Sequence, residues 1–173
     1  TALLALNVQK EVLNAFINVD EGLSKTIENY SAKNNELYTS FDEKALANKS
    51  KVGPWRDLAY QVKEKADEIY DLIQDLKVKI VVTSEGEDSE AIGANKHIDV
   101  QKINGKDNMD IPAQIMVGDN IANSNGRELK EKINEFHDFL MENINEKATL
   151  TRESIDASLD THDHEADDGT VHP

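Results

Sequence analysis

The chain has 173 residues, of which 38% are hydrophobic and 31% charged, a composition that is typical of one folded domain and excludes a disordered protein. Its formal net charge of −15 repels phosphate backbones and anionic headgroups, which argues against a nucleic-acid-binding protein. The sequence contains no cysteine, which excludes disulfides, thiolate nucleophiles and cysteine metal sites without choosing a compartment.

The chain begins with an apolar run, residues 2–6, that passes without a helix breaker into a helical pattern. A membrane-crossing helix needs roughly 20 mostly apolar residues, and this run supplies only a fraction of them. We therefore interpret residues 1–6 as the outer end of a transmembrane helix that is truncated in this sequence. The first long helix is predicted over residues 7–37. Its apolar face consists of Val12, Phe16, Val19, Leu23, Ile27 and Tyr30.

Two helix starts are predicted in the next segment. Ser40 and Glu43 have the spacing of a capping box, which predicts a short helix that ends before Pro54. The second long helix is predicted to begin at Gly53 and Pro54, because proline suits a first turn in which its missing N–H would be unpaired anyway. The apolar face of this second helix is formed by Trp55, Leu58, Val62, Ala66, Ile69, Ile73, Leu76 and Ile80. We expect Trp55 to be a core anchor, and a partner-facing role is the alternative.

Residues 83–124 show no helical period and are predicted to form a long irregular connection. Its short apolar pieces, which include Ile98, Ile103 and Ile115, either pair as small strands or dock on the helices, and we expect docking. The acidic stretch 85–90 is expected to be mobile, because its carboxylates repel one another and nothing nearby is large enough to bury.

A third long helix is predicted from Asn125, with Glu128 at capping-box spacing. None of the three helices gains enough by burial to offset the cost of ordering its backbone alone. The predicted fold is therefore an all-α bundle of long antiparallel helices. The predicted core consists of Leu23, Ile27, Tyr30, Trp55, Leu58, Val62, Ile69, Ile73, Leu76, Leu129, Ile133, Phe136 and Leu140.

Residues 160–173 form an acidic and histidine-rich tail, the one place where imidazoles and carboxylates gather. Such side chains bind zinc and similar ions, but nothing in the pattern supplies a helical register to orient them. A solvated loop is favoured, and we predict no metal and no cofactor. The side chains concerned are His162, Asp163, His164, Glu165, Asp167, Asp168 and His172.

The other candidates for chemistry are weaker. His97 and His137 stand alone and are expected to be surface or packing histidines. Gly118, Asp119 and Asn120 are not followed by the glycine-lysine motif of a phosphate-binding loop. No serine or threonine is paired in the sequence with a histidine base. The chain is therefore predicted not to be an enzyme.

Three segments resemble one known family. The junction TALLALNVQKEVLNAF resembles the segment in which the GldM/PorM family leaves the inner membrane and enters the periplasm. DNMDIPAQIMVGDN at 107–120 and GRELKEKINEFHDFL at 126–140 resemble its first periplasmic domain, so the resemblance covers essentially the whole chain. It implies a core component of the type IX secretion and gliding apparatus of Bacteroidota, in which GldM is a dimeric shaft paired with the membrane ring protein GldL.

The resemblance also implies an organisation and a role. Residues 1–6 would end the inner-membrane anchor, and residues 7–173 would form a periplasmic helical-bundle domain. The domain would transmit motion, driven by the proton-motive force, from a GldL-like ring into the periplasm, and other secretion components would bind domains absent here. The expected interface of a parallel homodimer, or of the membrane-proximal part, consists of Leu3, Leu6, Val12, Phe16 and Val19. From Leu23 onward the first helix is expected to pack increasingly within its own bundle.

Two alternatives from other classes remain. A periplasmic sensor or ligand-binding bundle, anchored by an N-terminal transmembrane helix, requires a pocket with converging polar groups. A helical enzyme that uses the histidine-rich tail requires a metal, so a chelator would lower its melting temperature.

Overall fold

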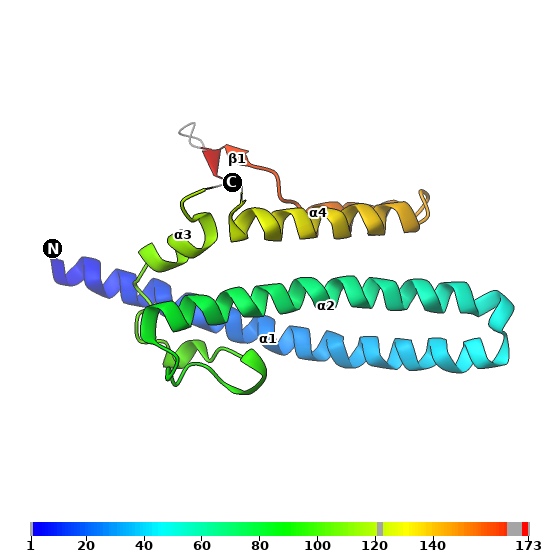
Figure 1. Ribbon diagram of the computed structural model, residues 1–173, viewed down its shortest axis with the longest axis horizontal. Coiled ribbons are helices and arrows are strands. Elements are labelled where there is room, and N and C mark those ends of the chain that lie inside the picture. Colours follow the sequence, from blue (N-terminus) through cyan, green and yellow to red (C-terminus); the bar gives the residue numbers. More distant parts are fainter. Residues whose placement is uncertain (1, 121–122, 166–170, 173) are drawn as a thin grey trace.

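The fold is seen in a computed structural model, which describes the backbone of residues 2–120, 123–165 and 171–172. Side chains are described from Glu11 to Asp163 except at 95, 121 and 122. Two long antiparallel helices form the frame, α1 (Ala2–Ala47) and α2 (Lys49–Glu85) (Figure 1). The prediction of an all-α bundle of long antiparallel helices is confirmed.

Helix α1 is longer than predicted and runs unbroken through 46 residues. The separate short helix expected from Ser40 does not exist, because Ser40 lies inside α1. No glycine or proline falls between Gly22 and Gly53, so nothing in the sequence interrupts the ladder of backbone hydrogen bonds at Ser40.

The chain reverses at Asn48, a single residue between α1 and α2. The Asn48 carboxamide oxygen accepts a hydrogen bond from the Lys51 N–H at 3.2 Å and caps α2. The predicted start at Gly53 and Pro54 is therefore wrong, since Pro54 lies inside the helix. Proline there costs one backbone hydrogen bond, but the asparagine cap upstream already sets the helix start.

Side chains near the reversal fix the register of α1 against α2. The Arg56 guanidinium donates to one Asp42 carboxylate oxygen at 2.6 Å, and the Tyr60 hydroxyl donates to the other at 2.8 Å. The Arg56 and Tyr60 hydrogen bonds hold the pKa of Asp42 below its usual value. The rings of Tyr38 and Tyr60 lie 5.3 Å apart between centroids. Farther along the pair, Ile17 of α1 is buried.

The segment after α2 folds back onto the end of that helix. It contains two short 3₁₀ turns, η1 (Ala94–Lys96) and η2 (Val100–Lys102). Ala91 and Ile98 form a buried cluster with Val81 of α2, and Ile103 packs against it. The expected docking of Ile98 and Ile103 is confirmed.

Glu85 holds this segment in place from the last turn of α2. Its carboxylate accepts hydrogen bonds from the Asn104 N–H at 2.6 Å, the Gly105 N–H at 2.9 Å and the Ser89 hydroxyl at 2.7 Å. The Gly105 bond is the largest cause of the lowered pKa of Glu85. The expectation that residues 85–90 are mobile through carboxylate repulsion is therefore wrong at Glu85 and Ser89. The negative charge of Glu85 is satisfied by hydrogen bonds that hold the segment in place.

The connection expected to be irregular also contains helix α3 (Asp110–Val117). Eight residues are too few to display a helical period in the sequence. Gly118 ends the helix at φ +62°, where its N–H donates to the Gln114 carbonyl at 2.8 Å. Ile115 is the residue by which α3 is buried.

Helix α4 (Asn125–Asn143) runs antiparallel to α2, and α5 (Thr149–Ser158) returns along α4 (Figure 1). Ser124 caps α4 by accepting the Arg127 N–H at 3.2 Å, one residue before the predicted start. Helix α5 was not predicted. The chain continues into an antiparallel pair of two-residue strands, β1 (His164–Glu165) and β2 (Val171–His172).

Burial in the single chain is sparse. Within the described side chains, the buried apolar residues are Ile17, Leu76, Val81, Ala91, Ile98 and Ile115. Of the predicted core, Leu76 belongs to this set. The partly buried members are Leu58, Val62, Ile69, Ile73, Leu129, Ile133, Phe136 and Leu140.

Four predicted core residues are exposed, namely Leu23, Ile27, Tyr30 and Trp55. The prediction is wrong for them in the single chain. Leu23, Ile27 and Tyr30 are exposed because α2 packs against a different side of α1, and Trp55 of α2 is 62% exposed. In the part of the chain that the structure describes, no helix has the length and apolar character needed to cross a membrane.

Candidate interaction surface

One face of α1 carries large apolar side chains that touch little of their own chain. We define the α1 seam as Val12, Phe16, Val19, Leu23, Ile27 and Tyr30, whose exposed fractions lie between 48% and 67%. Their spacing of three and four residues places them in one row along the helix. The seam is thus a continuous apolar strip that this chain leaves uncovered.

A second face of α1 supplies the contact with α2. Ile17 is buried there, and Leu13, Ser24 and Tyr38 are partly buried. At 100° per residue, Ile17 and Ser24 lie more than a quarter turn around the helix from the centre of the seam, and Leu13 and Tyr38 lie roughly 80° and 60° from it. Helix α1 therefore has two faces suited to packing, and a single copy uses one of them.

None of the seam side chains is itself charged although the chain is strongly acidic, and the Lys33 ammonium group lies 5.3 Å from the centre of the Tyr30 ring. The charged residues of this stretch, Asp20, Glu21, Lys25 and Glu28, lie outside the row of seam positions. The Glu21 side chain points toward the turn η2, where its carboxylate accepts a hydrogen bond from the Gln101 side chain at 2.7 Å. A partner can therefore cover the seam from Val12 to Ile27 without burying a seam charge, whereas at Tyr30 it would meet the Lys33 ammonium group.

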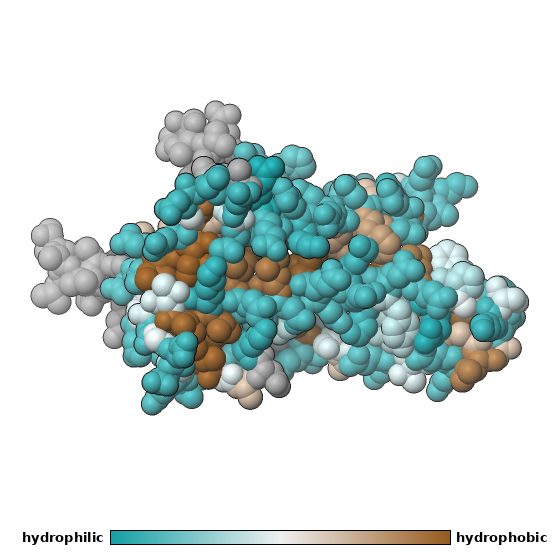
Figure 2. All heavy atoms as spheres, in the orientation of Figure 1, coloured by the Kyte–Doolittle hydropathy of each residue, from teal (hydrophilic) through white to brown (hydrophobic). Residues whose placement is uncertain are grey.

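The total surface shows that the single chain is not compact. Its accessible surface is 13,111 Å², whereas a compact monomer of 19.3 kDa exposes about 8,500 Å². Figure 2 shows further apolar side chains in a band beside α2 and α4. Exposed apolar side chains, the seam among them, contribute to this surface.

Leu3 and Leu6 belong to the predicted interface but lie outside the described side chains, although their backbone is part of α1. Val12, Phe16 and Val19 all lie on the exposed seam. Leu23, Ile27 and Tyr30 share the same row, so the surface extends well beyond the expected membrane-proximal part.

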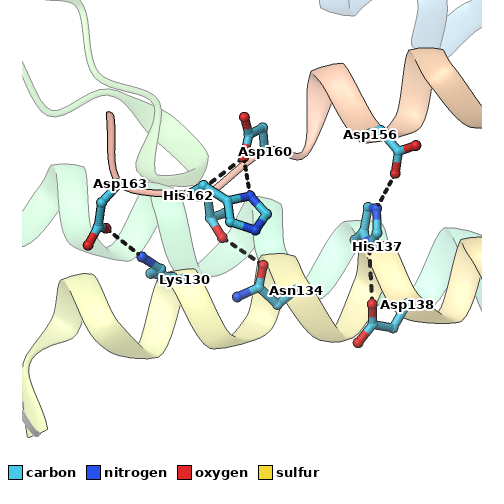
Figure 3. Close-up of polar contacts among 9 residues, drawn as sticks. Lys130, Asn134, His137, Asp138, Asp156, Asp160, His162 and Asp163 are labelled. Carbon is cyan, nitrogen blue, oxygen red and sulfur yellow. Dashed lines mark hydrogen bonds and ion pairs between the residues drawn. The ribbon is translucent and has the colours of Figure 1, made fainter. Parts of the chain in front are cut away.

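A polar cluster joins α4 to the chain that returns along it, and we call it the α4–α5 clasp (Figure 3). The Lys130 ammonium group lies 3.0 Å from the Asp163 carboxylate, and the Thr161 hydroxyl donates to the Asn134 side chain at 2.7 Å. His137 Nε2 lies 2.8 Å from the Asp156 carboxylate of α5. These contacts border a shallow hollow of about 480 Å³.

His137 differs from the lone surface or packing histidine that was expected. Its other ring nitrogen, Nδ1, lies 3.0 Å from the Asp138 carboxylate. The contact with Asp156, followed by that with Asp138, raises the pKa of His137 above its ordinary value. Sequence reasoning missed this site because Asp156 lies on a helix that it did not predict.

The histidine-rich tail is only partly within the described chain. The His162 ring lies 2.6 Å from the Asp160 carboxylate, and Asp163 contacts Lys130. Among the side chains that the structure describes, no group of three or more potential ligands could hold a metal ion. The predicted cluster members His164, Glu165, Asp167, Asp168 and His172 lie outside those side chains.

A second hollow, of about 500 Å³, lies between α2, α3 and the start of α4. Its lining includes the exposed side chains of Lys79, Thr83, Gln114, Asp119 and Asn123. This is the feature that a ligand-binding function would use. These five side chains supply two amides, a hydroxyl, one positive charge and one negative charge. This mixture favours no particular class of ligand.

The sequence matches the family model of the GldM N-terminal domain over residues 11–172. The matched range includes the whole α1 seam and the α4–α5 clasp. A comparison with curated proteins gives no match.

Proposed function

The chain belongs to the GldM N-terminal domain family, which places it among the components of type IX secretion and gliding motility, and from this premise we propose that it is a rigid, non-enzymatic shaft element. It would carry motion from an inner-membrane motor into the periplasm, with the proton-motive force as the energy source. The observation that carries the proposal is α1, one unbroken 46-residue helix with an uncovered apolar seam.

Helix α1 has the mechanical properties that a shaft needs. At 1.5 Å per residue it extends about 70 Å, and its hydrogen-bonded backbone resists bending far better than a flexible linker does. Helix α2 braces it along the side, and the Asp42 contacts with Arg56 and Tyr60 tie the far ends together. A displacement applied near residue 11 is then delivered to the reversal at Asn48.

We propose that a second copy of the chain covers the seam in a parallel homodimer. Its two α1 helices would meet through Val12, Phe16 and Val19 near the two-fold axis, with Leu3 and Leu6 continuing the contact toward the membrane. The exposure of Leu23 and Tyr30 extends the proposed contact farther along the helix than the sequence suggested. An uncharged strip is what allows two chains of net charge −15 to approach closely.

The remaining assignments follow from the family and belong to the same proposal. Residues 1–6 would end an inner-membrane anchor, and residues 7–173 would lie in the periplasm. A GldL-like ring protein would be the membrane partner, and other type IX components would act through further domains. No residue of this sequence is assigned to the proton-coupled step.

Cysteine crosslinking in the intact membrane protein tests the proposal. The sequence has no cysteine of its own, so Val12→Cys and Phe16→Cys provide single thiols. Equivalent thiols on two parallel helices that meet at the seam come within disulfide range, which requires Cα atoms about 4.4–6.8 Å apart. We expect both variants to form dimers under mild oxidation.

The matched controls are Asn14→Cys and Lys25→Cys, which place the thiol on exposed positions away from the seam. These variants are expected to form no disulfide between copies under the same oxidation. Failure of Val12→Cys or Phe16→Cys to crosslink, or equal crosslinking by the controls, would contradict a dimer axis along the seam.

A further inference from the structure

We propose that residues 149–163 form a proton-stabilised latch on α4, closed when the His137 ring carries two protons and loosened when it carries one. The latch consists of α5 and the chain that follows it as far as Asp163. This inference does not depend on the shaft function or on dimerisation. It is carried by the contacts of the α4–α5 clasp.

The clasp has a regular construction. The α4 positions that hold the latch are Lys130, Asn134, His137 and Met141, spaced by four, three and four residues in one row. Their partners run in the opposite direction along the returning chain and are Asp163, Thr161, Asp156 and Arg152. The two segments are thus fastened by a matched series of polar contacts, of which Figure 3 shows those made by Lys130, Asn134 and His137.

Apolar burial contributes little to this attachment. None of the described residues of α5 is buried. Ile155 and Leu159 are partly buried, whereas Leu150 is 78% exposed. The position of α5 therefore depends mainly on its polar contacts, and the loss of one of them matters more than it would in a well-packed helix.

Arg152 anchors the beginning of the latch at every pH in the physiological range, because a guanidinium does not lose its proton there. It donates to the Met141 carbonyl at 2.8 Å and to the Ile144 carbonyl at 3.0 Å, at the end of α4. The latch is therefore hinged at Arg152, and the titratable contact lies one turn farther on at Asp156.

His137 makes that contact sensitive to protons. Both ring nitrogens lie within hydrogen-bond distance of a carboxylate oxygen, Asp156 at 2.8 Å and Asp138 at 3.0 Å. A neutral imidazole has one N–H and can donate to only one of them, whereas an imidazolium donates to both. In the neutral ring, the second nitrogen presents a lone pair to an anion.

The charged groups that face the His137 ring directly are carboxylates, which favour its protonated form. Asp138 comes from α4 itself and Asp156 from α5. Along the same hollow, Lys130 is paired with Asp163, and His162 lies against Asp160. From α2, the Lys65 ammonium group lies 5.0 Å from the centre of the Phe139 ring, on a different side of α4.

The direction of the pH effect follows from linkage. Asp156 and Asp138 raise the pKa of His137 in the folded chain. The stabilisation is therefore fully present below the ordinary histidine pKa of about 6.5 and is lost as the pH rises through the raised value. The latch is closed in mildly acidic solution and loosens in mildly alkaline solution.

Hydrogen exchange of the full chain tests the latch, with protection expressed relative to the intrinsic exchange rate at each pH. We expect the protection of residues 154–159 to fall by at least about threefold between pH 5.5 and pH 8.5. Protection around residue 152 is expected to change less, because Arg152 does not titrate. Protection of 154–159 that does not depend on pH would overturn the proposal.

Three variants assign the effect to the ring. His137→Gln keeps a hydrogen-bonding side chain without a titration and is expected to abolish the pH dependence. His97→Gln removes an exposed histidine elsewhere and is expected to preserve it. Asp156→Asn is expected to lower the His137 pKa measured by NMR, a readout that holds even if His137→Gln folds poorly. Persistent pH dependence in His137→Gln, or an unchanged His137 pKa in Asp156→Asn, would overturn the proposal.

Discussion

Leu76 and Leu46 show how unequally the apolar side chains of this domain are used. Leu76 is buried in α2, whereas Leu46 is 89% exposed near the reversal. Truncation of a buried leucine removes apolar burial and leaves a cavity, so we expect Leu76→Ala to lower the free energy of unfolding by roughly 2–4 kcal/mol. Leu46→Ala is expected to change it by less than about 0.5 kcal/mol. Urea denaturation followed by circular dichroism measures both, and equal effects would refute the described burial.

Single residues also show what a helical period can and cannot predict. Leu23 and Leu76 both stand in an apolar row of three and four residue spacing, and the sequence assigned both to the core. One is buried and the other exposed, because periodicity identifies an apolar face but not the element that covers it. Trp55 was misplaced for the same reason. His137 was undervalued because its partner Asp156 lies 19 residues away on an unpredicted helix.

At the scale of elements, helix starts depend on single polar side chains. Ser124 is buried, and its hydroxyl accepts the Arg127 N–H at the beginning of α4. We expect Ser124→Ala to destabilise the domain by about 1 kcal/mol, the usual cost of a lost N-terminal cap. The matched control is Ser154→Ala within α5, where the serine is exposed and its hydroxyl donates to the Leu150 carbonyl. This control is expected to change stability by less than about 0.5 kcal/mol in the same urea titration.

The elements that sequence reasoning found are those long enough to repeat. Helices α1, α2 and α4 carry several turns of apolar spacing and were predicted. Helix α4 begins at Asn125 as predicted, whereas the Asn48 cap starts α2 upstream of its predicted start. Helices α3 and α5 have 8 and 10 residues and give too few turns for a period to emerge. Their positions are set by contacts with α2 and α4, which local sequence does not encode.

At the scale of the molecule, net charge and the seam oppose each other. Two chains of charge −15 repel each other, and salt weakens this repulsion by shortening the screening length. The screening length is about 30 Å at 0.01 M salt and about 8 Å at 0.15 M. If a second copy covers the seam, we expect the dissociation constant of the dimer to fall several-fold as salt rises across this range. Sedimentation equilibrium measures the change, and a constant that rises with salt would show attraction through charges instead.

The same experiment distinguishes the seam from other surfaces. Phe16→Asp places a carboxylate on the seam and is expected to keep the protein monomeric at both salt concentrations. Asn14→Asp adds the same charge outside the seam and is expected to leave dimerisation close to that of the unchanged chain. Phe16 is 67% exposed, so its replacement leaves the fold of a single copy intact.

The large solvent-accessible surface of a single chain affects how long it survives proteolysis in the cell. Elements that bury little open often, and proteolysis follows the population of the open form when opening is fast. If a second copy covers the seam, we expect paired chains to open less often and to be degraded more slowly than an unpaired chain. Turnover would then adjust the number of surviving chains to the number of complete assemblies, without a dedicated regulator.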